Sequence, residues 1–123
     1  MPKVLVVEDE MLIRLHVADS FRDSGFTVLE AADGAQALRI LEQDPSIDAV
    51  FTDITLPGDI DGFAVARWVR SRRPAAKVFL TSGEVTAAHA ERVAGDEPFF
   101  AKPCDYTEVA EIIRGRLESC GAC

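Results

Sequence analysis

The sequence has no hydrophobic run long enough to cross a membrane. Its longest uninterrupted apolar runs, such as Val4–Val7, are four residues long, whereas a membrane-spanning helix needs about 20 such residues. The amino terminus also lacks the apolar core and the small-residue cleavage site of a secretory signal. We therefore expect a cytoplasmic location and no membrane partner.

Cysteine is scarce as well. The chain has three cysteines, Cys104, Cys120 and Cys123, and an odd number in a cytosolic protein argues against a disulfide framework. Cys120 and Cys123 have the C-x-x-C spacing. Redox pairs of this kind lie at the start of a helix, which stabilises the thiolate, whereas here a helix is expected to end. We interpret residues 119–123 as a frayed tail.

Positive charge is in the minority. The 13 lysines and arginines face 21 aspartates and glutamates, which leaves a net charge of −8. Since no basic stripe runs along the chain, direct binding of nucleic acid is not expected. Four arginines do gather ahead of Pro74, where we expect them to complement the carboxyl end of a helix: Arg67, Arg70, Arg72 and Arg73.

The remaining pattern is that of one α/β domain over residues 1–123. Hydrophobic residues make up 48% of the chain, and they alternate between short apolar runs and amphipathic stretches. The runs show little polar alternation, which is typical of parallel strands covered on both faces. They are Val4–Val7, Thr27–Ala31, Ala49–Phe51, Val78–Thr81 and Phe99–Ala101. A helical pattern follows each of these runs, and the fourth such pattern is short and covers residues 86–93. The sequence therefore predicts a (βα)5 doubly wound sheet with right-handed crossovers.

Polar side chains follow four of these strands. Glu8, Asp9 and Glu10 come after the first and Asp53 after the third, while Thr81 and Ser82 end the fourth and Lys102 follows the fifth. Ligands of open parallel sheets bind outside the carboxyl ends of the strands, so these groups should lie together. Closely packed carboxylates resist ionising without compensation. An all-oxygen donor set predicts Mg²⁺, or Mn²⁺, at this edge.

Each of these residues has an ordinary explanation when it is considered alone. Acids after a strand are often solvated loop residues, Lys102 could be a surface lysine, and Ser82 before Gly83 could belong to a turn. Their coincidence at four strand ends supports the functional interpretation.

Around these strand ends the chain resembles the receiver domain of a two-component response regulator. The resemblance rests on VLVVEDE, FTDITLPGDIDG, SG and AKP, in this order and spacing. It implies a flavodoxin-like sheet with strand order 2-1-3-4-5, a cis Lys102–Pro103 bond, and a phosphorylation switch that is regulatory rather than an enzyme. No output domain follows in this sequence, so it is expected either to act as a stand-alone receiver or to be cut from a longer protein.

The resemblance also assigns roles to individual residues. Asp53 would be the phosphoacceptor, and Glu8, Asp9, Asp53 and the backbone carbonyl of Thr55 would hold the metal. Lys102 would pair with Asp53 and then with a phosphoryl oxygen. Ser82, with Thr81 as the alternative, would hydrogen-bond the phosphoryl group. Gly83 would keep the site open, Glu84 would tune hydrolysis, and Phe99 would turn inward on activation.

The expected partners follow from the same resemblance. A histidine kinase or a histidine phosphotransfer protein would supply the phosphoryl group, and a downstream protein would bind the face formed by the fourth helix, fifth strand and fifth helix. Activation could also produce a homodimer. Two alternatives stay open. One is an interaction module that is never phosphorylated. The other is an aspartate-nucleophile phosphatase, which would need an acid where this chain has Thr55.

Overall fold

The fold is a five-stranded parallel sheet in the order β2-β1-β3-β4-β5, as predicted. The computed structural model describes residues 1–83 and 98–121. The strands are β1 (Lys3–Val7), β2 (Thr27–Ala31), β3 (Ala49–Asp53), β4 (Lys77–Ser82) and β5 (Phe99–Ala101). The predicted helix over residues 86–93 lies outside the described residues.

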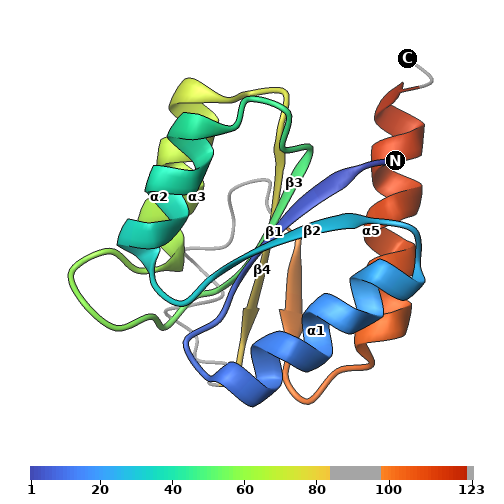
Figure 1. The fold of residues 1–123 in the computed structure, drawn as a ribbon, viewed down its shortest axis with the longest axis horizontal. Helices are drawn as coiled ribbons and strands as arrows, with labels where there is room; N and C mark the ends of the chain where they lie inside the picture. Colours follow the sequence, from blue (N-terminus) through green and yellow to red (C-terminus); the bar gives the residue numbers. More distant parts are fainter. Residues whose placement is uncertain (84–97, 122–123) are drawn as a thin grey trace.

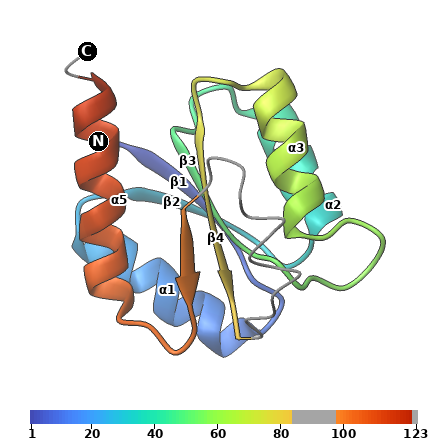
Figure 2. The same cartoon turned by 180° about the vertical axis from the view of Figure 1, so that it is seen from behind.

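Helices cover both faces of the sheet. They are α1 (Met11–Asp23), α2 (Gly34–Gln43), α3 (Gly62–Arg72) and α5 (Tyr106–Gly121). Figures 1 and 2 show α1 and α5 on one side of the sheet and α2 and α3 on the other. Helix α5 continues to Gly121, three residues into the stretch predicted as a frayed tail. None of the described helices is both long enough and apolar enough to span a membrane.

The central strands are buried on both faces, which explains their continuous apolar runs. In β1, Leu5 and Val7 face the core under α2 and α3, whereas Val4 and Val6 face the core under α1 and α5. All five residues of β3 are buried. Successive side chains of a strand point to opposite faces, so one short strand contributes to both cores.

Local signals in the sequence set where the helices begin. The Asp33 carboxylate accepts a hydrogen bond from the Gln36 backbone N–H at the start of α2, and Asp61 does the same for Ala64 at the start of α3. These are typical N-caps, since they satisfy backbone donors that have no partner within the helix. The caps fix where the loops from β2 and β3 end, close to the carboxyl edge of the sheet.

Candidate functional site

Three charged side chains from separate strand ends meet at the carboxyl edge of the sheet. Glu8 directly follows β1, Asp53 is the last residue of β3, and Lys102 directly follows β5. Glu8 is only 5% exposed and Asp53 only 7% exposed. Carboxylates buried to this degree need compensating charge or protonation.

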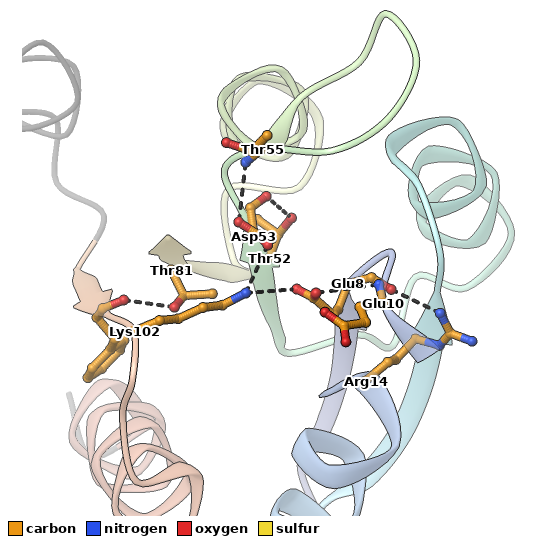
Figure 3. A network of polar contacts seen from close by, with 9 residues as sticks. Glu8, Glu10, Arg14, Thr52, Asp53, Thr55, Thr81 and Lys102 are labelled. Atoms are coloured by element: carbon orange, nitrogen blue, oxygen red, sulfur yellow. Dashed lines mark hydrogen bonds and ion pairs between the residues drawn. The ribbon is translucent and has the colours of Figure 1, made fainter. Parts of the chain in front are cut away.

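Lys102 supplies part of that compensation. Its Nζ lies 2.9 Å from Asp53 Oδ2 and 3.2 Å from Glu8 Oε2, so one ammonium group is shared by two carboxylates (Figure 3). Burial lowers the pKa of Lys102, but the hydrogen bond and charge of Asp53, followed by those of Glu8, outweigh it and raise the pKa. Lys102 is therefore held in its charged form.

The carboxyl group of Glu8 is left under-compensated. Burial, and then the neighbouring Asp53 carboxylate, raise the pKa of Glu8 from 4.5 to about 7, and Lys102 offsets this only in part. Near neutral pH this acid stands between its two protonation states. A cation that joins the cluster would favour the ionised form.

Contacts within the turn after β1 hold Glu8 in place. Arg14, in α1, donates from Nη1 to the Glu8 carbonyl oxygen at 2.9 Å, and its Nε lies 3.4 Å from Glu30 Oε1. The Glu10 backbone N–H donates to Glu8 Oε1 at 3.4 Å. These contacts hold the turn between β1 and α1. Sequence reasoning did not identify Arg14, because no motif distinguishes it from other helix cations.

Asp53 is held by its neighbours in the chain, on both sides of the end of β3. The Thr55 backbone N–H donates to Asp53 Oδ1 at 3.2 Å, and Thr52 Oγ1 donates to the Asp53 carbonyl oxygen at 2.9 Å. The loop then returns so closely that a Cβ on Gly62 would lie 2.3 Å from the Asp53 carbonyl oxygen. Glycine at position 62 is thus required by the close approach of two backbone segments.

The predicted metal acids are close enough to share one ion. Carboxylate oxygens of Glu8, Asp9 and Asp53 all lie within 4.8 Å of one another. Asp9 is exposed, while the other two acids are buried. This set of hard oxygen donors, open to solvent on the Asp9 side, fits Mg²⁺, which keeps several waters and takes few carboxylates.

The other predicted site residues lie along β4, β5 and the loop after β3. Ser82 and Thr81 are buried at the end of β4, and the Thr81 hydroxyl donates to the Phe100 carbonyl oxygen at 2.7 Å. Gly83 is exposed next to them, and Glu84 lies outside the described residues. Thr55 is exposed in the loop after β3.

Two further sequence predictions concern Phe99 in β5 and the Lys102–Pro103 bond that follows this strand. Phe99 is partly buried in β5, paired with Leu80 of β4, and packs against the core on the α2 and α3 side. The Lys102–Pro103 peptide bond is cis, as predicted.

The fold and this edge define a class of protein: a doubly wound α/β domain with an acidic, lysine-bridged pocket at its strand ends. Residues 4–114 match the family described as the response regulator receiver domain, and the chain belongs to this family. It is a signal-transduction domain of two-component systems in which phosphorylation-dependent switching is the general role. The family is generally regulatory rather than catalytic.

Relatives in sequence support this assignment. The chain is 35% identical to the aerobic respiration control protein ArcA of Escherichia coli K12, with 94% of this chain and 48% of that protein covered. It is 34% identical to a putative NtrX-like response regulator of Rickettsia felis, with 94% of this chain and 25% of that protein covered. It is 33% identical to sensor kinase CckA of Brucella abortus, with 94% and 12% covered. The chain therefore spans less than half the length of these relatives.

Solved structures agree on the fold. A receiver protein of Sinorhizobium medicae superposes with a TM-score of 0.87 at 27% identity, with 95% of this chain and 94% of that chain covered. A receiver domain of Clostridium thermocellum superposes with a TM-score of 0.88 at 23% identity, with 99% and 98% covered.

Proposed function

We propose that this receiver accepts a phosphoryl group on Asp53, with magnesium bound beside it, from a histidine kinase or a histidine phosphotransfer protein. One observation carries the proposal: the Lys102 ammonium lies 2.9 Å from Asp53 Oδ2 at an edge where two further carboxylates gather. A nucleophilic aspartate needs a neighbouring cation, because negative charge accumulates as the phosphoryl group arrives.

The chemistry is a direct transfer. A carboxylate oxygen of Asp53 forms a bond to phosphorus as the phosphorus–nitrogen bond of a donor phosphohistidine breaks. The electron pair of that bond stays on the imidazole nitrogen, and Asp53 becomes an acyl phosphate. Lys102 pairs with a phosphoryl oxygen. Glu8, Asp9, Asp53 and the Thr55 carbonyl would hold Mg²⁺, which supplies charge neutralisation at the phosphoryl oxygens.

The switch would begin at the end of β4. Ser82, at the end of β4, would hydrogen-bond the phosphoryl oxygens, with Thr81, whose hydroxyl donates to the Phe100 carbonyl oxygen, as the alternative. Among the described residues, a Cβ on Gly83 would meet no atom within 4 Å, so this position leaves room beside Ser82. Movement of Ser82 would favour an inward position of Phe99 and change the face formed by the fourth helix, β5 and α5, where a downstream protein would bind. Glu84 would tune the lifetime of the phosphoryl group.

This chain presents an apolar surface next to the site, to which the donor protein could bind. At the start of α1, Met11 is 58% exposed, Leu12 72% and Leu15 43%. These side chains follow directly after Glu8, Asp9 and Glu10 in the sequence. Exposed apolar clusters of this kind mark interaction sites, and a donor histidine must come within bonding distance of Asp53. Because a kinase takes its phosphoryl group from ATP, the proposal includes a cytoplasmic location.

Intact-mass spectrometry tests the proposal. The protein is incubated with a small phosphodonor and Mg²⁺, and the expected result is the gain of one phosphoryl group. Asp53→Asn should abolish the gain, whereas Asp59→Asn, at an exposed loop position, should leave it unchanged. No gain with any donor, or labelling that persists in Asp53→Asn, would overturn the proposal and favour an interaction module that is never phosphorylated. Size-exclusion chromatography of the phosphorylated protein checks the predicted homodimer.

A further inference from the structure

Helix α3 ends in a cluster of arginines that the site does not use. We call Arg67, Arg70, Arg72 and Arg73 the α3 arginine patch. No acid occurs between Gly62 and Ala76, although the chain as a whole carries a net charge of −8. The patch is therefore a local reversal of the protein's charge.

Three of the four arginines of this patch have no paired carboxylate in the part of the chain that the structure describes. Within residues 1–83 and 98–121, Arg67, Arg72 and Arg73 form no ion pair with a carboxylate. Elsewhere in the same residues, several cations do form such pairs: Lys3, Arg14, Arg22, Lys102 and Arg114. Charge of one sign gathered without counter-charge marks a binding surface for the opposite sign.

Helix capping accounts for only part of this charge. The carboxyl end of a helix carries about half a negative elementary charge, and its effect falls off within the last turn. Arg70 and Arg72 lie in the last turn of α3, which is sufficient for that purpose. Arg67 lies more than one turn earlier, so the helix dipole does not explain it.

The patch is also pre-organised by an aromatic ring. The guanidinium carbons of Arg72 and Arg73 lie 5.4 Å and 5.8 Å from the centre of the Trp68 ring, within the range of cation–π contact. Arg73 donates from Nη1 to the Arg72 carbonyl oxygen at 3.1 Å. In the described part of the chain, Arg73 Nε is buried without a hydrogen-bond partner. Two guanidinium groups gathered beside one aromatic ring offer N–H donors that suit bidentate recognition of carboxylates.

We propose that the α3 arginine patch binds an acidic, glutamate- and aspartate-rich segment of a partner protein. Charge complementarity and the two guanidinium groups beside Trp68 favour this occupant. Nucleic acid is the weaker candidate, since a long polyanion would also meet the acidic remainder of a chain with a net charge of −8. A short acidic segment can engage the patch alone.

The position of the patch makes this binding independent of the phosphorylation switch. Helix α3 begins beside Asp53 and ends at the opposite edge of the domain (Figure 1). At the rise of an α-helix, Arg67 lies about 8 Å and Arg72 about 15 Å along the axis from Gly62, the first residue of α3. A partner held there would remain bound to both the phosphorylated and the unphosphorylated protein.

Trp68 is the only tryptophan in the chain, and it reports directly on the patch. A labelled oligoglutamate peptide is titrated by fluorescence anisotropy, with Trp68 emission recorded in parallel. Binding should perturb this emission and weaken as salt rises. Removing two guanidinium groups in Arg72→Gln/Arg73→Gln should weaken binding roughly tenfold. Arg67→Gln/Arg72→Gln changes only exposed residues and should also weaken it.

The control variant carries the same change of charge elsewhere. Arg39→Gln/Arg116→Gln alters exposed arginines of α2 and α5, and its affinity should remain within about twofold of wild type. Asp53→Asn should bind the peptide as wild type does, which separates this test from that of the proposed function. Absence of binding at low salt, or equal loss in the control variant, would overturn the proposal. Tighter binding of single-stranded DNA than of the peptide would overturn the choice of partner.

Discussion

Replacing Glu8 by glutamine should stabilise the metal-free protein at neutral and higher pH. The folded-state pKa of Glu8 is raised from 4.5 to about 7 by burial and by Asp53. A group with a raised folded-state pKa stabilises the fold below its unfolded pKa, and this contribution is lost as the pH rises through the folded pKa. The free energy of unfolding should therefore fall between pH 4.5 and about 7, by about 2–3 kcal/mol after a discount for screening.

Glu8→Gln should avoid this fall in the free energy of unfolding. The glutamine oxygen can still accept the hydrogen bond from the Glu10 backbone N–H, and its amide N–H can donate to Asp53. Urea unfolding followed by the single Trp68 is measured in a chelator across this pH range. Above pH 7, Glu8→Gln should exceed wild type by about 2–3 kcal/mol, and near pH 4.5 the two should converge. Added Mg²⁺ should stabilise wild type more than the variant.

Glu10→Gln is the matched control, because Glu10 is exposed and follows in the same turn. Its stability should follow the wild-type pH profile. If Glu8→Gln shows no gain above pH 7, or if its difference from wild type is the same at every pH, the argument that burial and Asp53 destabilise ionised Glu8 is refuted. A change in the slope of unfolding free energy against urea would indicate a different effect, on the compactness of either state.

Three further predictions concern backbone and surface sites. Gly62→Ala should destabilise the fold by about 1–3 kcal/mol, since its Cβ would lie 2.3 Å from the Asp53 carbonyl oxygen; a wild-type melting temperature would contradict this. Gly115→Ala lies in α5, where the added Cβ would have no neighbour within 4 Å in the described part of the chain; it should raise stability by about 1 kcal/mol, measured in the same urea assay. The hydrogen bonds from Lys3 and then Ser46 lower the pKa of Asp44 to about 2, so its contribution to stability should be present above pH 3.8 and lost as the pH falls toward 2. An NMR titration checks this, and Lys3→Met should return the Asp44 pKa toward 3.8.

The fold could be predicted because its strands have a distinctive pattern. A strand such as β3, buried along its whole length, must be apolar on both faces, and short continuous runs of this kind are typical of parallel sheets. The runs Thr27–Ala31 and Phe99–Ala101 were predicted with the bounds that the structure has. The other three strands differ by one or two residues, because strand ends depend on backbone pairing that apolar patterning does not record.

The site could be predicted only to the level of which strand ends meet. Topology brings Glu8, Asp53 and Lys102 to one edge, and the sequence already placed each of them after a strand. It did not predict that Lys102 is shared between Asp53 and Glu8, or that Arg14 donates to the Glu8 carbonyl. These contacts depend on side-chain rotamers and on the path of a turn, which residue spacing does not determine.

The charge of the pocket explains why a domain would keep an arrangement that costs stability. When ionised, Glu8, Asp9 and Asp53 carry three negative charges against the single positive charge of Lys102. The surplus of two charges matches one divalent cation. If Glu8 were apolar, Lys102 and Asp53 would form a closed pair and the pocket would attract a cation weakly. If Lys102 were absent, the two buried carboxylates of Glu8 and Asp53 would share no cation and would repel one another. The shared lysine therefore pairs with Asp53, and the surplus acids favour the binding of a divalent cation, which the proposed phosphoryl transfer would require.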